Sequence, residues 1–212
     1  MELSPLQTIL RTIAAAARIP VMIILIAFVA FSLFSIGWII VEGIRERRHL
    51  NYELSKLLDE MRKRDTELRG CINDSGLLQR QKEALTELTW HPKFSREMLL
   101  ALEDNLIEKE QAHYDRILKS TELVSKLAPM CGLLGTLIPL GPGIIALGQG
   151  DTYTLSESML TAFDTTVAGL IAAGICLTIH SVRTRWYKAY MLDLETLADC
   201  AVEIMGEKNE QE

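Results

Sequence analysis

Two apolar stretches of this sequence contain hydroxyl side chains at depths where membrane-crossing helices would bring them together. Thr136 lies in the uncharged stretch 127–150, and Thr166 lies in the apolar stretch that begins near residue 155. At about 1.5 Å rise per residue, Thr136 is about 18 Å from the start of its span and Thr166 about 16 Å from the start of its own. In antiparallel spans both hydroxyls reach the bilayer midplane, so we predict that they can face each other. The alternative is that they bond only to carbonyls of their own helices or across a packing interface.

A carboxylate, Asp164, lies in the same stretch as Thr166 and directly before a second threonine, Thr165. A charged side chain near the bilayer centre costs about 2.5–3.5 kcal/mol, so it should face a partner or a water-filled cavity. On a helical wheel of about 100° per residue, Asp164 shares a face with Thr161, whereas Thr166 points roughly the other way. We therefore expect Asp164 to border a wet pore; a buried bond to a neighbouring helix is the alternative.

Glycines and prolines accompany these polar residues. Gly132 and Gly135 lie in the earlier stretch, and Gly169 lies in the later one. Because glycines let membrane helices approach closely, we expect these three to form the packing face of the two spans. Pro139 and Pro142 are predicted to bend the earlier span near its outer end, since proline cannot complete the helical hydrogen-bond ladder.

Motifs of soluble enzymes are missing: there is no GxxxxGK[ST] phosphate loop, no GxSxG elbow and no HExxH zinc helix. Glu110 and His113 form half of a carboxylate metal motif, but the required second copy is absent. His91 and His180 have no ligand partner in the sequence, so we predict no metal, no cofactor and no enzymatic activity. The net charge of −6 argues against a nucleic-acid partner.

Long helices are needed to position these residues. Residues 19–41 contain no charge and can cross about 30 Å of hydrocarbon, which is too long for the core of a signal peptide. Helical periodicity continues beyond them and is expected to break at Gly70 and the run Asn73-Asp74-Ser75-Gly76. We predict an all-α fold: a three-span transmembrane bundle whose long helices extend into a cytoplasmic helical domain. The predicted segments are an amphipathic N-terminal helix (1–18), transmembrane helices (19–41, 122–148 and 156–182), a cytoplasmic helical domain (42–121), an external turn (149–155) and a cytoplasmic C-terminal helix and tail (183–212).

The basic residues predict the orientation of these spans. Arg45, Arg47 and Arg48 follow the first span, Arg183 follows the third, and the turn 149–155 carries no positive charge. Cytoplasmic flanks are enriched in Lys and Arg. We therefore predict a multi-pass protein of the cytoplasmic (inner) membrane, with its N-terminus outside and its C-terminus in the cytoplasm.

Two short motifs give the sequence a family resemblance. The run Gly132-Leu133-Leu134-Gly135-Thr136 and the Thr-Thr-x-x-Gly-Leu pattern of Thr165 to Leu170 resemble the MotA/TolQ/ExbB proton channel family. The resemblance covers most of residues 95–185. Three spans with a long cytoplasmic loop agree best with the three-span ExbB/TolQ type.

The resemblance implies a homopentamer around two single-span helices of a partner similar to ExbD, TolR or MotB, whose intramembrane aspartate carries the proton. It also implies that Thr136 and Thr166 line the proton route. The pore glutamate of ExbB falls near Thr161, which is a departure from the family pattern. Either Asp164 compensates from a neighbouring turn, or this branch manages without that carboxylate. The predicted function is the pore and stator subunit of a proton-driven membrane motor that couples ion flow to rotation or force. A membrane-anchored structural or adaptor protein and a self-sufficient ion channel are the alternatives.

Overall fold

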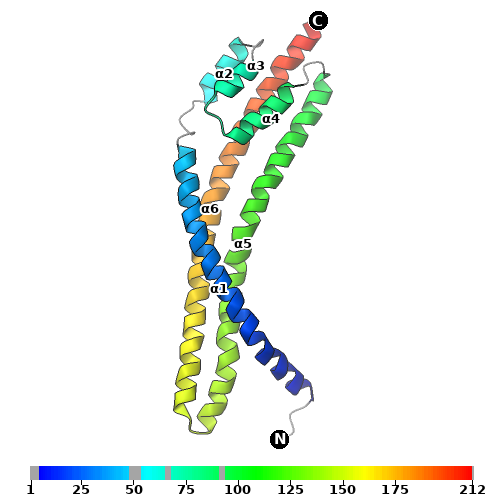
Figure 1. The fold of residues 1–212 in the computed structure, drawn as a ribbon. Helices are drawn as coiled ribbons and strands as arrows, with labels where there is room; N and C mark the ends of the chain where they lie inside the picture. The colour runs from blue at the N-terminus through cyan, green and yellow to red at the C-terminus, as the bar shows by residue number, and fades with distance from the viewer. Residues whose placement is uncertain (1–4, 48–53, 65–67, 91–93, 212) are drawn as a thin grey trace. The chain divides into compact units, whose positions relative to one another are not determined.

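The chain is mostly helical over the residues described by its structure, a computed structural model that covers residues 5–47, 54–64, 68–90 and 94–211. These residues contain no strand, which confirms the all-α prediction. The helices are α1 (Pro5–Arg47), α2 (Leu54–Lys63), α3 (Leu68–Asp74), α4 (Gln79–Thr89), α5 (Arg96–Gly148) and α6 (Thr152–Gln211) (Figure 1).

The helices divide between two compact units. The first, which we call the apolar unit, consists of Met1–Ile39 and Lys119–Ser181, and the second, the polar unit, consists of Ile40–Leu118 and Val182–Glu212. Within the described ranges, three helices are long and apolar enough to cross a membrane, over Ile9–Ile44 of α1, Arg96–Gly148 of α5 and Thr152–Glu207 of α6. Each continues well beyond the length that a bilayer requires, as the sequence predicted.

In the apolar unit, α5 and α6 run antiparallel beside each other (Figure 1). Small side chains make up most of their contact, and α1 adds the aromatic side chains of Phe28 and Phe31. The buried side chains at this contact are those of Val124, Ala128, Ala172, Ala173 and Cys176. Small residues at the contact allow the helix backbones to come close, which gives membrane helices the dispersion contacts that hold them together.

The turn between α5 and α6 is short and held by several backbone hydrogen bonds. Gly150 has a φ of 79°, a conformation that glycine adopts without strain. The Asp151 N–H donates to the Ala146 carbonyl at 2.9 Å and the Gly150 N–H donates to the Leu147 carbonyl at 3.0 Å, which is the Schellman pattern that ends a helix. The Asp151 carboxylate then accepts the Thr154 N–H at 3.0 Å and so caps α6. One helix is therefore closed and the next one capped within three residues.

The polar unit has a continuous hydrophobic core made by α2 to α6. Its buried side chains are Leu57, Met61, Leu68, Cys71, Ile72, Leu77, Ala84, Leu85, Leu88, Leu99, Leu106, Leu194, Leu197, Ala198, Ala201, Val202 and Met205. Each fully buried leucine contributes about 1.5–3 kcal/mol relative to an exposed one. Of the predicted breakers, Gly70 does not interrupt the helix, because α3 continues through it. The helix does end at Asp74, within the predicted run Asn73 to Gly76. A glycine inside a helix costs only about 1 kcal/mol of stability. This is less than the stability gained by burying Leu68 and Ile72.

Polar bonds hold α4 against the two long helices. The Gln81 side chain accepts the Leu78 N–H at 3.1 Å, at the start of α4, and donates to the Tyr190 carbonyl of α6 at 3.0 Å. Arg80 donates two hydrogen bonds to the Glu110 carboxylate of α5, at 2.7 and 2.9 Å. These hydrogen bonds fix the position of α4 along α5 and α6, in addition to the hydrophobic contacts that hold it there.

Candidate ion-conducting site

Three glycines set the distance between α5 and α6 where the sequence places its threonines. A Cβ atom at Gly135 would lie 2.7 Å from the Thr165 Cβ, closer than real side chains approach. A Cβ atom at Gly169 would lie 2.7 Å from the Ala128 carbonyl oxygen, and one at Gly132 would lie 3.2 Å from the Thr165 carbonyl oxygen. The helices can have this spacing only because these positions carry no side chain.

The structure brings Thr165 to this contact. Its side chain is buried, and its hydroxyl donates to carbonyls of its own helix, with oxygen distances of 2.9 Å to Ala162 and 3.1 Å to Thr161. Thr165 thus packs against Gly135, while the neighbouring residues Thr136 and Thr166 lie beside this contact and are only half-buried.

The other threonine hydroxyls also bond within their own helices. Thr136 donates to the Leu133 carbonyl at 2.7 Å and Thr166 donates to the Ala162 carbonyl at 3.2 Å. Thr161 donates to the Glu157 carbonyl at 3.0 Å. These bonds use the hydroxyl hydrogen and leave lone pairs on the hydroxyl oxygen, so each hydroxyl can still accept a hydrogen bond from water or bind a cation.

Asp164 does not join the packed face of the two helices. Its side chain is exposed, as are those of Phe163 and Val167, and it has no hydrogen-bond partner among the described residues. It lies about 100° around the helix from Thr165. Thr161, one turn earlier, is half-buried on the same side. A single chain therefore leaves a carboxylate uncovered on an apolar helix face.

The prolines of α5 leave backbone acceptors open near Thr136. The helix runs through Pro139 and Pro142 without a break in its assignment. Proline has no N–H, so the carbonyls of Gly135 and Ile138 lose the donors that normally lie four residues later. Backbone carbonyls in an apolar helix need another partner, such as water or an ion. These two acceptors lie one residue before and two residues after Thr136.

Three residues of the polar unit form a buried polar cluster that the sequence analysis did not connect. Arg183 of α6 donates to Glu42 Oε2 of α1 from Nε at 3.0 Å and from Nη2 at 2.6 Å. The Tyr187 hydroxyl donates to Glu42 Oε1 at 2.7 Å. Both charged side chains are nearly inaccessible, with exposed fractions of 5% for Arg183 and 13% for Glu42. The cluster joins α1 to α6.

Within the described residues, no set of three His, Cys, Asp or Glu side chains is arranged to hold a metal ion. His113 contacts the ring of Tyr114 edge-on, with ring centroids 5.7 Å apart. His91 lies outside the described residues.

Comparison with known proteins gives one family. The model of the MotA/TolQ/ExbB proton channel family matches residues 77–196, which include α4, all of α5 and most of α6. A search of the curated proteins found no match. The matched region contains every threonine, glycine and carboxylate discussed for α5 and α6, and the three apolar helices agree with the three-span ExbB/TolQ type. The chain is a multi-pass membrane protein that belongs to the MotA/TolQ/ExbB proton channel family.

Proposed function

We propose that this chain is the pore and stator subunit of a proton-driven membrane motor. Five copies form a ring around two single-span helices of a partner protein, and the partner's intramembrane aspartate carries the proton. Proton flow then drives rotation or force on the partner. The family match across the whole of α5 and most of α6 supports the proton-channel role.

The exposure of Asp164 is the structural observation that carries the proposal. A carboxylate on the lipid-facing side of a membrane helix costs about 2.5–3.5 kcal/mol. Asp164 is exposed between the apolar side chains of Phe163 and Val167 in the single chain. An assembly that turns this face toward a water-filled pore removes the cost. Asp164 and Thr161 then supply the polar lining at the position where ExbB has its pore glutamate.

Thr136 and Thr166 line the route for the proton in this proposal, with Thr165 holding α6 against Gly135. The carbonyls opened by Pro139 and Pro142 add acceptors that keep water beside Thr136. No covalent chemistry is involved. Each charge that crosses the membrane supplies about 2.3 kcal/mol per 100 mV, so several protons pass for each mechanical step.

The proposed topology places the polar unit in the cytoplasm and the turn between α5 and α6 outside, in the cytoplasmic (inner) membrane. The basic residues beyond the first and third spans support this orientation, because they lie on one side while the turn has no positive charge. Protons driven inward are then released on the side of the polar unit.

Replacing Thr166 with valine is expected to preserve folding and assembly but to slow proton flux at least tenfold. Valine has nearly the volume of threonine and lacks the hydroxyl. The measurement is the decay of a pH gradient in liposomes that contain the chain purified with its single-span partner. Thr136→Val should behave in the same way. Thr178→Val is the matched control, because Thr178 donates to the Gly174 carbonyl at 2.9 Å in the same i to i−4 pattern. Normal flux in Thr166→Val would remove this threonine from the route.

Two substitutions at Asp164 test which way it faces. If it lines the pore, Asp164→Asn should leave a ring of five in native mass spectrometry and change the ion flux severalfold. Asp164→Leu should also assemble, because a pore-facing residue bonds to no neighbouring helix. A collapsed ring in Asp164→Leu together with unchanged flux in Asp164→Asn would instead assign Asp164 to a bond between helices. Flux through the chain without its partner would favour a self-sufficient channel, and absence of flux under every condition would favour an adaptor.

A further inference from the structure

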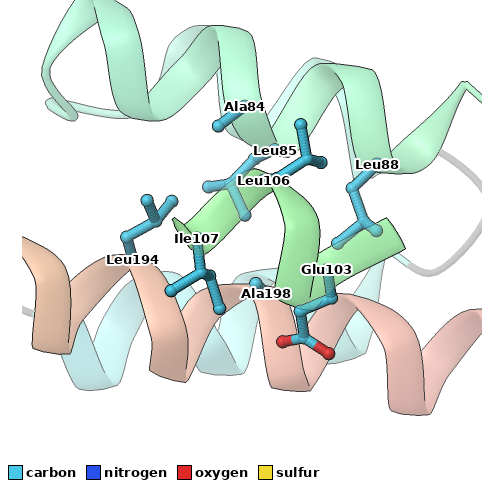
Figure 2. Close-up of a pocket in the computed structure, with 8 residues that line it drawn as sticks. All are labelled: Ala84, Leu85, Leu88, Glu103, Leu106, Ile107, Leu194 and Ala198. Carbon is cyan, nitrogen blue, oxygen red and sulfur yellow. The ribbon is translucent and has the colours of Figure 1, made fainter. Parts of the chain in front are cut away.

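The polar unit buries a carboxyl group among leucines. Glu103 of α5 is only 4% exposed. It borders a small pocket between α4, α5 and α6, and Figure 2 shows its carboxyl group extending from α5 toward α6. The other side chains that line this pocket are all apolar: Ala84, Leu85, Leu88, Leu106, Ile107, Leu194 and Ala198. A charged carboxylate is strongly disfavoured in such surroundings.

The hydrogen bonds and charges around Glu103 also oppose its ionisation. Its Oε1 atom is buried and has no hydrogen-bond partner among the described residues. The charged groups that act on it are acidic: Asp199 and Glu195 on α6, and Asp104 on α5. The side chains that α4 contributes to the pocket are apolar. Burial first, and then the charge and hydrogen bonding of Asp199, raise the pKa of Glu103 to about 7.

We propose that Glu103 and Asp199 form a proton-binding pair through which pH near neutrality controls how tightly α4 packs on α5 and α6. Asp199 is exposed, so a proton from solvent can reach the pair. When that proton is on Glu103, the carboxyl is neutral and can donate a hydrogen bond to the Asp199 carboxylate. When it leaves to solvent, two neighbouring carboxylates repel and the Glu103 charge requires water in the pocket.

The direction of the effect follows from the raised pKa of Glu103. In an opened state that exposes Glu103, its pKa returns to the ordinary value of about 4.3. The packed state therefore holds one more proton than the opened state between these two pKa values. The stabilisation is complete below pH 4 and is lost as pH rises toward 7, where it levels off. Acidification of the surrounding solution tightens the bundle.

This inference uses the proposed topology, in which the polar unit lies where protons are released. Inward proton flow that acidifies its surroundings would protonate Glu103 and tighten α4, while a neutral or alkaline cytoplasm would loosen it. The proton pair itself depends only on the packing of the polar unit. Its tests therefore need no ion flux, and they can succeed even if the chain conducts no protons.

The direct test is a ¹³C NMR titration of the full-length protein in detergent with labelled glutamate carboxyl groups. The resonance that is missing from the spectrum of Glu103→Gln identifies the Glu103 carboxyl. We expect its titration midpoint to lie within one pH unit of 7. Asp199→Asn should lower that midpoint, whereas Glu108→Gln, an exposed change on the same helix, should leave it in place. A Glu103 midpoint below 5.5, or one that Asp199→Asn does not lower, would overturn the proposal.

Hydrogen exchange of the α4 amides tests the link to packing. After correction for the intrinsic exchange rate, the opening equilibrium of Leu85 to Thr89 should rise about tenfold from pH 5.5 to 6.5 and become constant above pH 8. Glu103→Gln should remove this dependence, because glutamine mimics the protonated carboxyl at every pH. The same slope in wild type and Glu103→Gln would mean that the pair does not control α4.

Discussion

Replacing Arg183 with methionine is expected to destabilise the polar unit by about 3–5 kcal/mol. Methionine has a similar length but no charge, so the Glu42 carboxylate would remain buried with the Tyr187 hydroxyl as its bonded donor. Arg183 and Glu42 are only 5% and 13% exposed, so water cannot replace the guanidinium without opening the contact between α1 and α6. The loss should therefore far exceed that of a surface ion pair.

Denaturant unfolding of the purified chain in detergent provides the measurement. Trp186 is a local reporter, since a Cβ atom at Gly43 of α1 would lie 3.2 Å from its ring. Lys126→Met is the control, because it removes an exposed i to i+4 ion pair with Glu122 and should leave stability unchanged. Adding Glu42→Leu to Arg183→Met should recover most of the loss. If the double variant is no more stable than Arg183→Met, the cost comes from lost packing and not from a buried charge.

The second large effect is expected from Gly169→Ala. The added methyl group would lie 2.7 Å from the Ala128 carbonyl oxygen and 3.1 Å from the Gly132 Cα. Both atoms belong to the α5 backbone, so the clash is relieved only if the helices separate. Overpacking of this kind costs about 1–3 kcal/mol, and separation also loses the contacts of the small side chains around it. If the subunit forms the proposed ring of five, the variant ring should fall apart at a lower temperature than the wild-type ring.

Gly174→Ala provides a control within the same helix. No atom lies within 4 Å of a Cβ built at Gly174, so alanine adds only its higher helix propensity, worth up to about 1 kcal/mol. Thermal stability in detergent should thus rise slightly for Gly174→Ala and fall for Gly169→Ala. Equal stabilisation by both substitutions would show that α5 and α6 are farther apart in the membrane than the close approach of Gly169 to the Ala128 carbonyl indicates.

Local sequence patterns were sufficient to predict the fold class. The length of the three apolar stretches and the helical periodicity beyond them predicted long helices that extend past a membrane span, and the structure confirms this. The expected break occurs at the run Asn73 to Gly76, where α3 ends, and not at Gly70, because the burial of Leu68 and Ile72 outweighs the local cost of a helical glycine. Helix propensity is a local property, whereas this burial depends on what the rest of the chain brings to α3.

Sequence patterns could not predict which residues far apart in the chain contact each other. Glu42 and Arg183 are 141 positions apart. In the sequence, Arg183 indicates only the orientation of the third span. Depth counting set Thr136 opposite Thr166, whereas the structure packs Gly135 against Thr165, one residue away on each helix. Depth along a helix follows from residue number, but rotation about its axis depends on the neighbours. The burial of Glu103 was predictable from its spacing, because it lies on the same helical stripe as the buried Leu99 and Leu106.

The short turn between α5 and α6 has a consequence for biosynthesis. Only residues 149–151 lie outside the two helices, and three residues span about 10 Å at most. Such a turn cannot cross a hydrocarbon layer of about 30 Å, so α5 cannot occupy the bilayer while α6 waits on the other side. In the proposed topology, with the turn outside, we expect the two helices to enter together as a hairpin that carries Asp151 and Glu157 across. The apolar stretch of α6 would then leave the ribosome before α5 settles in the membrane.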